Sequence, residues 1–389
     1  MPVRASRIAR SAGAIVAVAT ALALCPSLAV GQTASTPPPD ETDDGWPDAS
    51  DFLDEKYGFL PLVIPITEPA VGYGAGVGAA FISAPLGAAR SGYDRPDITV
   101  VGGMYTDNGS WGAVAGDWRH WMDDRLQTLA GVVYSSVNLD FYGIGEDSVL
   151  KDDPLRYTLE PKGGAVQGKY RLGDSRAWIG LSYAFFTTRV TFEAPAGTPS
   201  LPDYDEDSNV GGLIASLTFD SRDNVFTPIR GTYVEGLVGL FDEALGGDDE
   251  FQRARIIGMQ FFPTDHRIYF GYRGEVAAVS SAAPFYLKPF VSMRGAPIMR
   301  YQGEEIAQLE AELRWQFWKR LSVVGFGGYG VTWNDFERLD DTRTVTTGGA
   351  GIRYELARRY GIHVGLDVAV GPDDNTAIYV QFGSAWARP

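Results

Sequence analysis

Hydrophobic and polar residues alternate with a period of two along almost the whole chain from Gly58 onward. In the segment that follows residue 304, one face carries Ala307, Leu309, Ala311, Leu313, Trp315 and Phe317, and the other carries Gln308, Glu310, Glu312, Arg314 and Gln316. In the last segment, Ile378, Val380, Phe382 and Trp386 share one face. Alternation of this kind predicts half-buried β-strands.

The alternating segments are separated by Gly, Pro, Asn and Asp residues, which are typical of turns. They predict sixteen strands, at residues 59–67, 71–84, 96–107, 110–121, 125–138, 158–171, 175–191, 209–220, 230–241, 251–262, 266–279, 304–316, 320–333, 344–357, 359–371 and 374–386. Long connections follow odd-numbered strands, at 139–157, 192–208 and 280–303, whereas most connections after even-numbered strands are short.

A soluble β-sandwich would also bury one apolar face, so the alternation alone does not decide the architecture. The opposite face is rich in Gly, Gln, Glu and Arg, which favours a wet lumen, and Trp and Tyr recur near the segment ends. Long loops at one end, short turns at the other and aromatic girdles are typical of outer-membrane barrels. The sequence therefore predicts an all-β, transmembrane, antiparallel barrel of about sixteen strands.

The first residues predict export. Arg4, Arg7 and Arg10 precede the uncharged apolar run 12–30, and small residues provide a cleavage site before Gln32. We interpret residues 1–31 as a signal peptide, with a membrane-anchoring helix as the alternative. Residues 32–57 form a Pro- and Asp-rich N-terminal tail that we expect to be loosely attached, and residues 58–389 form the barrel.

The amino-acid composition excludes some classes of partner. The formal net charge is −16, and removal of the three signal arginines makes it −16 − 3 = −19. This acidity argues against nucleic acid as a partner. The only cysteine, Cys25, would leave with the signal. No second apolar run could span a membrane, so a membrane location requires a closed barrel. We expect the cell outer membrane and its lipids as the surroundings.

The sequence gives no indication of catalysis. The three histidines, His120, His266 and His363, have no second ligand at metal-binding spacing, and no Gly-x-Ser-x-Gly motif is present. The glycines at 72, 74, 76 and 78 alternate with Tyr, Ala and Val, which indicates one smooth face of a strand rather than a phosphate loop. We expect no enzyme activity, no catalytic residues, no cofactor and no metal.

Several short motifs carry a resemblance to a known family. Two lie in the connection between predicted strands eight and nine: Asp220-Ser221-Arg222-Asp223-Asn224 and Pro228-Ile229-Arg230-Gly231. The others are Arg294-Gly295, Glu312-Leu313-Arg314 and Phe326-Gly327-Gly328-Tyr329-Gly330. Over residues 58–386 the chain resembles the outer-membrane assembly and secretion superfamily, whose members include BamA, TamA and the two-partner secretion transporters.

The resemblance implies two structural features. The first is a periplasmic turn containing Asp220, Arg222, Asp223, Pro228 and Gly231. The second is a sixth outer loop, folded into the lumen, that carries Arg294 and Gly295.

The sequence departs from the family pattern in this loop and around it. Ala296 replaces an aromatic residue, and Gly328 replaces an aspartate that is the usual partner of the loop arginine. We therefore expect Glu310 or Glu312 to pair with Arg294, with plain lumen charge as the alternative role of these glutamates.

The family's periplasmic POTRA domains have no counterpart in residues 32–57, so the resemblance implies a barrel-only member. Pro61 and Pro65 in the first strand would weaken the seam where the first and last strands meet, because proline cannot donate to a ladder. Gly383 in the last strand interrupts its side chains and permits a bend. One hypothesis is a barrel that assists insertion or translocation of proteins or lipids at this seam. Client outer-membrane proteins or periplasmic factors are then further partners. The alternative is a passive pore or a surface-structural protein.

Overall fold

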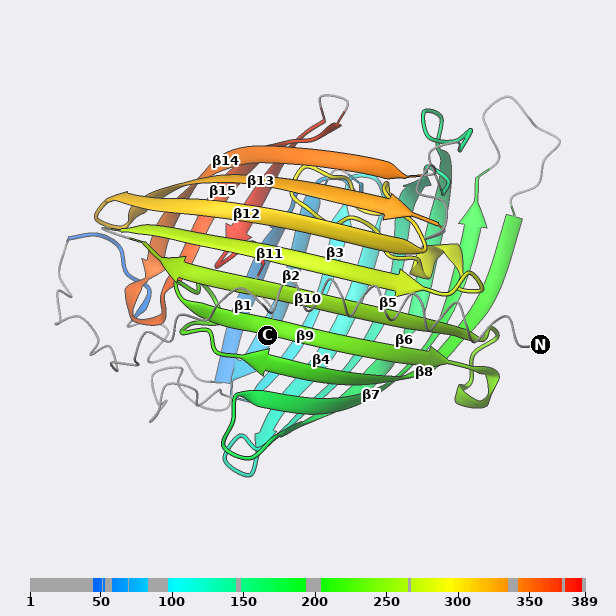
Figure 1. Cartoon of the computed structure of the whole chain (residues 1–389), viewed down its shortest axis with the longest axis horizontal. Helices are drawn as coiled ribbons and strands as arrows, with labels where there is room; N and C mark the ends of the chain where they lie inside the picture. The colour runs from blue at the N-terminus through cyan, green and yellow to red at the C-terminus, as the bar shows by residue number, and fades with distance from the viewer. Residues whose placement is uncertain are drawn as a thin grey trace.

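The computed structural model describes residues 45–50, 52, 58–68, 70–82, 97–144, 148–193, 204–264, 267–334, 342–372 and 375–386. The expected signal peptide, most of the expected tail and His266 lie outside these ranges. Sixteen strands make up most of the described chain (Figure 1). No helix in the described residues is long and apolar enough to cross a membrane.

The strands follow one another in sequence order (Figure 1). They are β1 (Gly58–Ile66), β2 (Gly74–Ile82), β3 (Ile98–Thr106), β4 (Trp111–Trp121), β5 (Leu126–Phe141), β6 (Leu155–Arg171), β7 (Ala177–Phe192), β8 (Tyr204–Asp220), β9 (Gly231–Phe241), β10 (Phe251–Pro263), β11 (Ile268–Val279), β12 (Glu305–Trp318), β13 (Leu321–Trp333), β14 (Arg343–Ala357), β15 (Ile362–Val370) and β16 (Thr376–Phe382). Short 3-10 helices occupy Glu243–Leu245 (η2), Phe285–Leu287 (η3) and Arg358–Tyr360 (η4).

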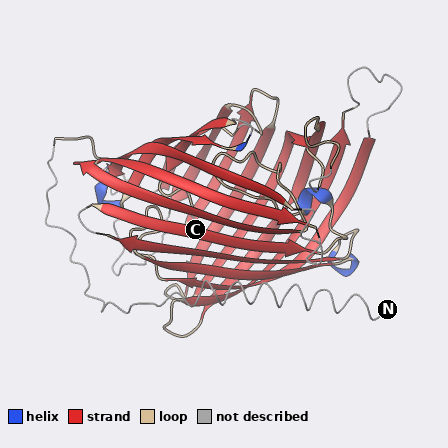
Figure 2. Ribbon diagram, turned by 45° about the horizontal axis from the view of Figure 1, so that its top comes forward, coloured by secondary structure: helices blue, strands red, loops and turns tan. Residues whose placement is uncertain are grey.

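Each strand pairs with its sequence neighbours in antiparallel register, and the sheet curls into one nearly closed barrel (Figure 2). Within the described residues no hydrogen-bonded ladder joins β16 back to β1. The barrel therefore keeps one seam. The connections after odd-numbered strands lie at one end, here called the loop end, and those after even-numbered strands lie at the opposite, turn end.

The register between strands assigns an inward or outward face to each residue. Glu310 points inward, so its register partners on neighbouring strands, and every second residue along each strand from them, line the lumen. The outward face carries half-exposed apolar side chains on all sides of the barrel, among them Val63, Val77, Val101, Val132, Leu181, Leu217, Val238, Leu313, Ile352, Val368 and Ile378. An apolar band of this kind is what a lipid bilayer requires of a spanning barrel.

The inner wall built by β1–β5 differs from the polar lumen that the sequence predicted. The inward positions of these strands include Leu62, Ile64, Val100, Met104, Val114, Trp118, Leu129 and Val133. The same strands are apolar outward as well, so their sequence alternates between two kinds of apolar residue and hides which face is inside. Charged inward side chains gather instead on β9–β15.

Part of the N-terminal tail is docked at the turn end. Asp48 Oδ2 lies 2.9 Å from Arg320 Nη1, and the Ala49 amide donates to the Leu356 carbonyl at 2.8 Å. The Trp46 ring meets Trp318 edge-on at 5.1 Å. The expectation of a loosely attached tail therefore does not describe residues 46–50, because Arg320 and the aromatic rims of β12 and β14 provide a binding surface that the tail's composition does not reveal.

Candidate functional site

The connection between β11 and β12, residues 280–304, enters the lumen and is called the plug loop here. Its two limbs are tied together by the Val291 amide, which donates to the Tyr301 carbonyl at 3.0 Å. Val291, Met293, Ala296 and Tyr301 form a buried cluster with Val345 of β14. These apolar side chains hold the loop against the inner barrel wall, because burying apolar surface is favourable.

Arg294 is the polar anchor of the plug loop. Its Nε donates to Glu310 Oε1 at 2.8 Å, and its Nη1 donates to Glu312 Oε2 at 2.7 Å and to Asp367 Oδ2 at 2.9 Å. The guanidinium lies 3.6 Å from the centre of the Phe326 ring. The structure therefore brings Arg294 together with both glutamates considered from sequence and adds Asp367 of β15.

Gly328 explains why the expected aspartate is dispensable. A Cβ at this position would lie 2.7 Å from Met293 Sδ, so a larger residue at 328 would require the Met293 side chain to move. The space that a carboxylate would fill is occupied by Met293. The third acidic partner is supplied by Asp367, which is also held by Arg353 at 2.8 Å.

The charges at this site compensate one another. Burial alone would lower the pKa of the Arg294 guanidinium, but the charges of Glu310, Glu312 and Asp367 outweigh burial and raise it. Arg294 therefore stays protonated at any pH at which the protein folds. Such a network specifies where the loop lies more than it adds net stability, because desolvation offsets much of the attraction.

Gly295 ties the plug loop to the last two strands. It has φ of +92°, a conformation that favours glycine, and a Cβ would approach the Val370 carbonyl to 3.1 Å. Its amide donates to the Tyr379 hydroxyl at 3.1 Å, and its carbonyl accepts from Asn375 Nδ2 at 3.3 Å. The loop therefore contacts β16, one border of the seam.

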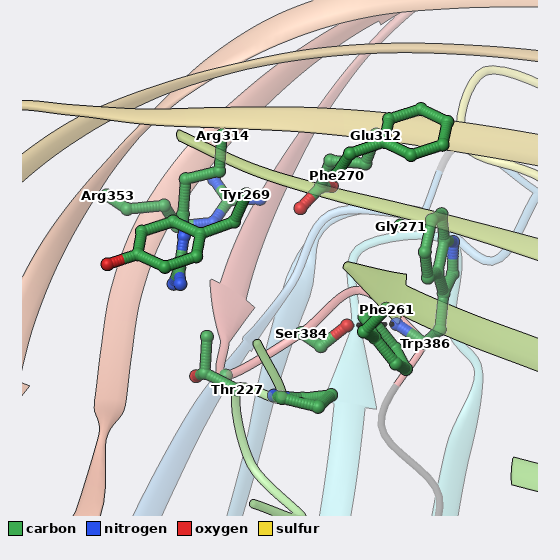
Figure 3. A pocket seen from close by; sticks show the side chains of 12 residues that line it. Thr227, Phe261, Tyr269, Phe270, Gly271, Glu312, Arg314, Arg353, Ser384 and Trp386 are labelled. Carbon is green, nitrogen blue, oxygen red and sulfur yellow. Dashed lines mark hydrogen bonds between the residues drawn. The ribbon is translucent and has the colours of Figure 1, made fainter. Parts of the chain in front are cut away.

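The chain turns into the lumen after β16. Gly383 has φ of +73°, and a Cβ there would collide with the Phe226 backbone. Trp386 follows, only 4% exposed, and packs with Tyr233, Ile257, Met259 and Phe261 on the inner faces of β9 and β10. We call residues 383–386 the C-terminal segment (Figure 3). The sequence placed Trp386 on the outward face with Ile378; that prediction is wrong, because Gly383 ends the strand and reverses the direction of the segment.

Glu310 links the plug loop to the C-terminal segment. One carboxylate oxygen accepts from Arg294, and the other accepts from Trp386 Nε1 at 2.8 Å. Glu310 is 2% exposed, so both hydrogen bonds lie away from bulk water. Charge-assisted bonds of this kind are stronger than neutral ones.

The turn motif between β8 and β9 is held by its own side chains. Arg222 binds Asp220 through two hydrogen bonds of 3.0 and 2.9 Å and is 1% exposed. Asp223 Oδ1 accepts from the amides of Ile229 and Arg230. Pro228 lies in this closed turn. Gly231, with φ of +103°, allows the chain to pass close to Ser221.

This turn also reaches the end of the barrel beside the seam. Asn224 Nδ2 donates to the Tyr360 carbonyl at 2.7 Å, and the Ser384 amide donates to the Phe226 carbonyl at 2.6 Å. The turn, the β14–β15 connection and the C-terminal segment are therefore one hydrogen-bonded assembly. Sequence reasoning assigned the turn no such contact.

The two prolines lie in β1, at the other border of the seam. Pro61 pairs in register with Ala79 and Pro65 with Ala75, without a break in the ladder to β2. Proline lacks an amide hydrogen and cannot donate to the ladder with β2. Because the register with β2 is unbroken, we infer that the imide nitrogens of both prolines are directed toward the free edge of β1. Because the two prolines are an even number of residues apart, both missing donors fall on the same edge.

Sequence reasoning missed three members of the site. Phe326 belongs to a motif to which the sequence assigned no contact with Arg294, and the sequence assigned Asp367 and Tyr379 no role in the site. The available signal was the acid Asp367 among the inward positions of β15, two residues from Gly365, the register partner of Arg353. Only the position of the plug loop selects it.

Known proteins share this architecture. Residues 151–373 match the family model of the Omp85 superfamily domain. BamA from Haemophilus ducreyi lacking POTRA domains 1–3 superimposes with a TM-score of 0.56 at 12% identity, covering 85% of this chain and 70% of that one. CdiB from Escherichia coli also gives 0.56 at 12% identity, covering 83% of this chain and 62% of that one. No curated protein has a significant sequence match to the chain.

Proposed function

The chain belongs to the Omp85 superfamily of outer-membrane barrels, and on this premise we propose that it assists the insertion or translocation of proteins or lipids at the seam between β1 and β16. Its partners in this proposal are outer-membrane lipids and client polypeptides that enter the bilayer. No catalytic step is part of the proposal.

The observation that carries the proposal is the incomplete seam. Ladders join every consecutive pair of strands, yet none joins β16 to β1 in the described residues. Both borders are weakened: β1 contains Pro61 and Pro65, and β16 is only 7 residues long before Gly383 bends the chain inward. Unpaired strand edges are places where another strand can add.

Two further features support the same function. The plug loop contacts β16 through Gly295 and Tyr379, and it shares Glu310 with the C-terminal segment. Movement of β16 would therefore change the contacts of the loop that fills the lumen. The apolar inner wall of β1–β5 adjoins the seam and offers an apolar surface to a lipid chain or an unfolded strand.

The test is to lock the seam with a disulfide. Pairs of cysteines, one at a position from Leu62 to Ile66 and one from Ala377 to Phe382, are introduced and oxidised in the purified protein. We expect the cross-linked protein to lose most of its ability to speed folding of an unfolded barrel, or movement of a labelled phospholipid, in reconstituted vesicles. Reduction restores the activity.

A matched control uses Leu181→Cys and Ala215→Cys, which face each other across the fully paired β7 and β8. This cross-link leaves the activity unchanged. If the oxidised seam variant is as active as the reduced one, lateral opening is not the mechanism. Steady ion conductance that is independent of the cross-link would favour the passive-pore alternative.

A further inference from the structure

A second cluster of side chains lines a cavity at the turn end of the lumen (Figure 3). It is bounded by the β8–β9 turn, by β11 and β12, and by the C-terminal segment. Its polar surface comes from two arginines, one carboxylate, two hydroxyls and a tyrosine: Arg314, Arg353, Glu312, Thr227, Ser384 and Tyr269. Phe261 and Trp386 close its apolar side. The plug-loop anchor lies beside it, because Glu312 belongs to both.

Arg314 is the unusual member of this cavity. It is 7% exposed, and it forms no ion pair or hydrogen bond within the described part of the chain. Its Nη1 is buried without a hydrogen-bond partner. Its guanidinium lies 4.5 Å from the centre of the Tyr269 ring. Burying an unpaired charge is costly, so a cation of this kind is usually compensated by a counter-ion.

The carboxylates nearest to Arg314 are committed elsewhere. Glu312 binds Arg294 at 2.7 Å, and Glu355 lies 3.3 Å from Arg358. The neighbouring Arg353 is held by Asp367. Glu312 and Glu355 act on Arg314 through their charges, but Arg314 has no direct ion pair with either carboxylate in the described part of the chain.

Hydroxyl groups complete the cavity. Thr227 Oγ1 is buried and has no hydrogen-bond partner among the residues that the structure describes. Ser384 Oγ accepts from the Trp386 amide at 3.2 Å, so its own hydrogen remains available to donate. A guanidinium without a direct counter-ion that lines the same cavity as two hydroxyl groups fits a tetrahedral oxyanion, since arginine binds phosphate oxygens with directed, charge-assisted hydrogen bonds.

We propose that Arg314, Thr227 and Ser384 form a binding site for a phosphate-class oxyanion inside the barrel. The ligand is either a free phosphate or the phosphodiester of a lipid headgroup. A lipid headgroup is one of the two sources because Gly383 and Ser384, which line the cavity, directly follow β16, the border strand of the seam. The site goes beyond the proposed function, because binding does not require the seam to open.

The test measures binding of radiolabelled inorganic phosphate to the full chain in a phosphate-free maltoside detergent by equilibrium dialysis. We expect saturable binding of one phosphate per chain. Arg314→Gln removes the charge and weakens binding by at least about tenfold, the scale expected for a hydrogen bond to a charged group. Thr227→Val keeps the charge and weakens binding by a smaller factor.

Arg189→Gln is the matched control, because it removes the same charge from an exposed position on β7 and leaves phosphate binding unchanged. Heat-dependent gel mobility shows that each variant is folded, and if Arg314→Gln fails to fold, Thr227→Val decides. A soluble short-chain phosphatidylglycerol is then used as competitor. Competition at much lower concentration than unlabelled phosphate identifies the lipid source, and no competition identifies free phosphate. Absence of saturable binding, or equal displacement by chloride at the same ionic strength, overturns the proposal.

Discussion

At the scale of single residues, Arg294 determines where the plug loop lies. One guanidinium meets carboxylates from two strands, Glu310 and Glu312 of β12 and Asp367 of β15, while Phe326 covers its face. These strands are separated along the barrel wall, so the loop can satisfy all three acids in only one position. Arg294 therefore selects one position of the plug loop relative to the strands, a role for which buried ion pairs are well suited.

Arg294→Ala should destabilise the folded barrel by about 3–5 kcal/mol, because two buried carboxylates and the partly buried Glu312 would lose their shared partner. Arg294→Lys should recover part of this, since an ammonium keeps the charge but cannot reproduce the planar guanidinium geometry. The measurement is urea-induced unfolding followed by tryptophan fluorescence in detergent. Arg189→Ala, an exposed arginine, serves as control and should change the midpoint little. An Arg294→Ala midpoint equal to that of the control would contradict the anchoring role.

Predictions from the sequence were also most specific at the level of single residues. The Arg-Gly pair and the alternation of β12 were enough to bring Arg294 together with Glu310 and Glu312 as candidates. The same reasoning could not select Asp367, because contacts between segments far apart in sequence depend on how deeply the loop enters the lumen. It also could not see that Gly328 makes room for Met293.

At the scale of elements, the C-terminal segment behaves as a separate piece from β16. The strand ends at Phe382, Gly383 reverses the chain, and Trp386 is buried against β9 and β10 on the inner wall. Sequence alternation continued through this point and predicted one strand over 374–386. The pattern of side chains could not reveal the break, because it depends on a left-handed glycine beside Phe226 of another turn.

Trp386→Phe tests the bond between this segment and the plug-loop anchor. The ring stays in its apolar cluster, but Glu310 loses the indole donor, so we expect a loss of about 1.5–3 kcal/mol in unfolding free energy. Trp315→Phe, a half-exposed tryptophan on the outward face, is the control and should cost less. Combining Trp386→Phe with Glu310→Gln should cost less than the sum of the two single changes. Strict additivity would show that the two residues do not interact.

The docked part of the tail responds to acid through Asp48. Burial would raise the pKa of this carboxyl, but hydrogen bonds from Ser50 and Arg320 outweigh burial and place it below its ordinary value of 3.8. A lowered folded-state pKa stabilises docking above about pH 3.8, and this contribution is lost as the pH falls through the lowered value.

We therefore expect a dye attached to a cysteine at position 49 to become more mobile in acid. Its fluorescence anisotropy should be constant from neutral pH to about pH 4 and then fall. Asp48→Asn should give the low anisotropy already at neutral pH, because it removes the charge that faces Arg320. Asp174→Asn, which changes an exposed acid in another turn, should leave the profile unchanged. A profile that is flat to pH 2.5 would rule out this contact as the tether.

At the scale of the whole molecule, the strand number and order and the outward apolar face could be predicted from the sequence. The period-two pattern is local, and each predicted segment has its counterpart among the sixteen strands. The character of the lumen could not be predicted in the same way. β1, β3 and β5 are apolar on both faces, so alternation does not distinguish their inner side from their outer side.

The filled interior predicts low conductance. The plug loop, the C-terminal segment and the β8–β9 turn all occupy the lumen or its turn end. Replacing residues 285–301 with a short Gly-Ser linker should convert a nearly silent barrel into one with steady conductance in planar bilayers, because water then fills the vacated space. Shortening the connection that contains η2 should have no such effect. A wild-type protein that already conducts as well as the linker variant would favour the pore.

The two borders of the seam have a consequence for how firmly another chain can adhere there. An open sheet edge normally recruits strands without discrimination and holds them, which is the origin of aggregation. Here one edge lacks two amide donors at Pro61 and Pro65, and the other offers only the short run of β16. A strand from another chain can form only a few backbone hydrogen bonds with either edge, so it dissociates quickly. If the seam has the proposed function, we expect the protein to accept a client strand at its edge and release it again, without polymerising with its own copies.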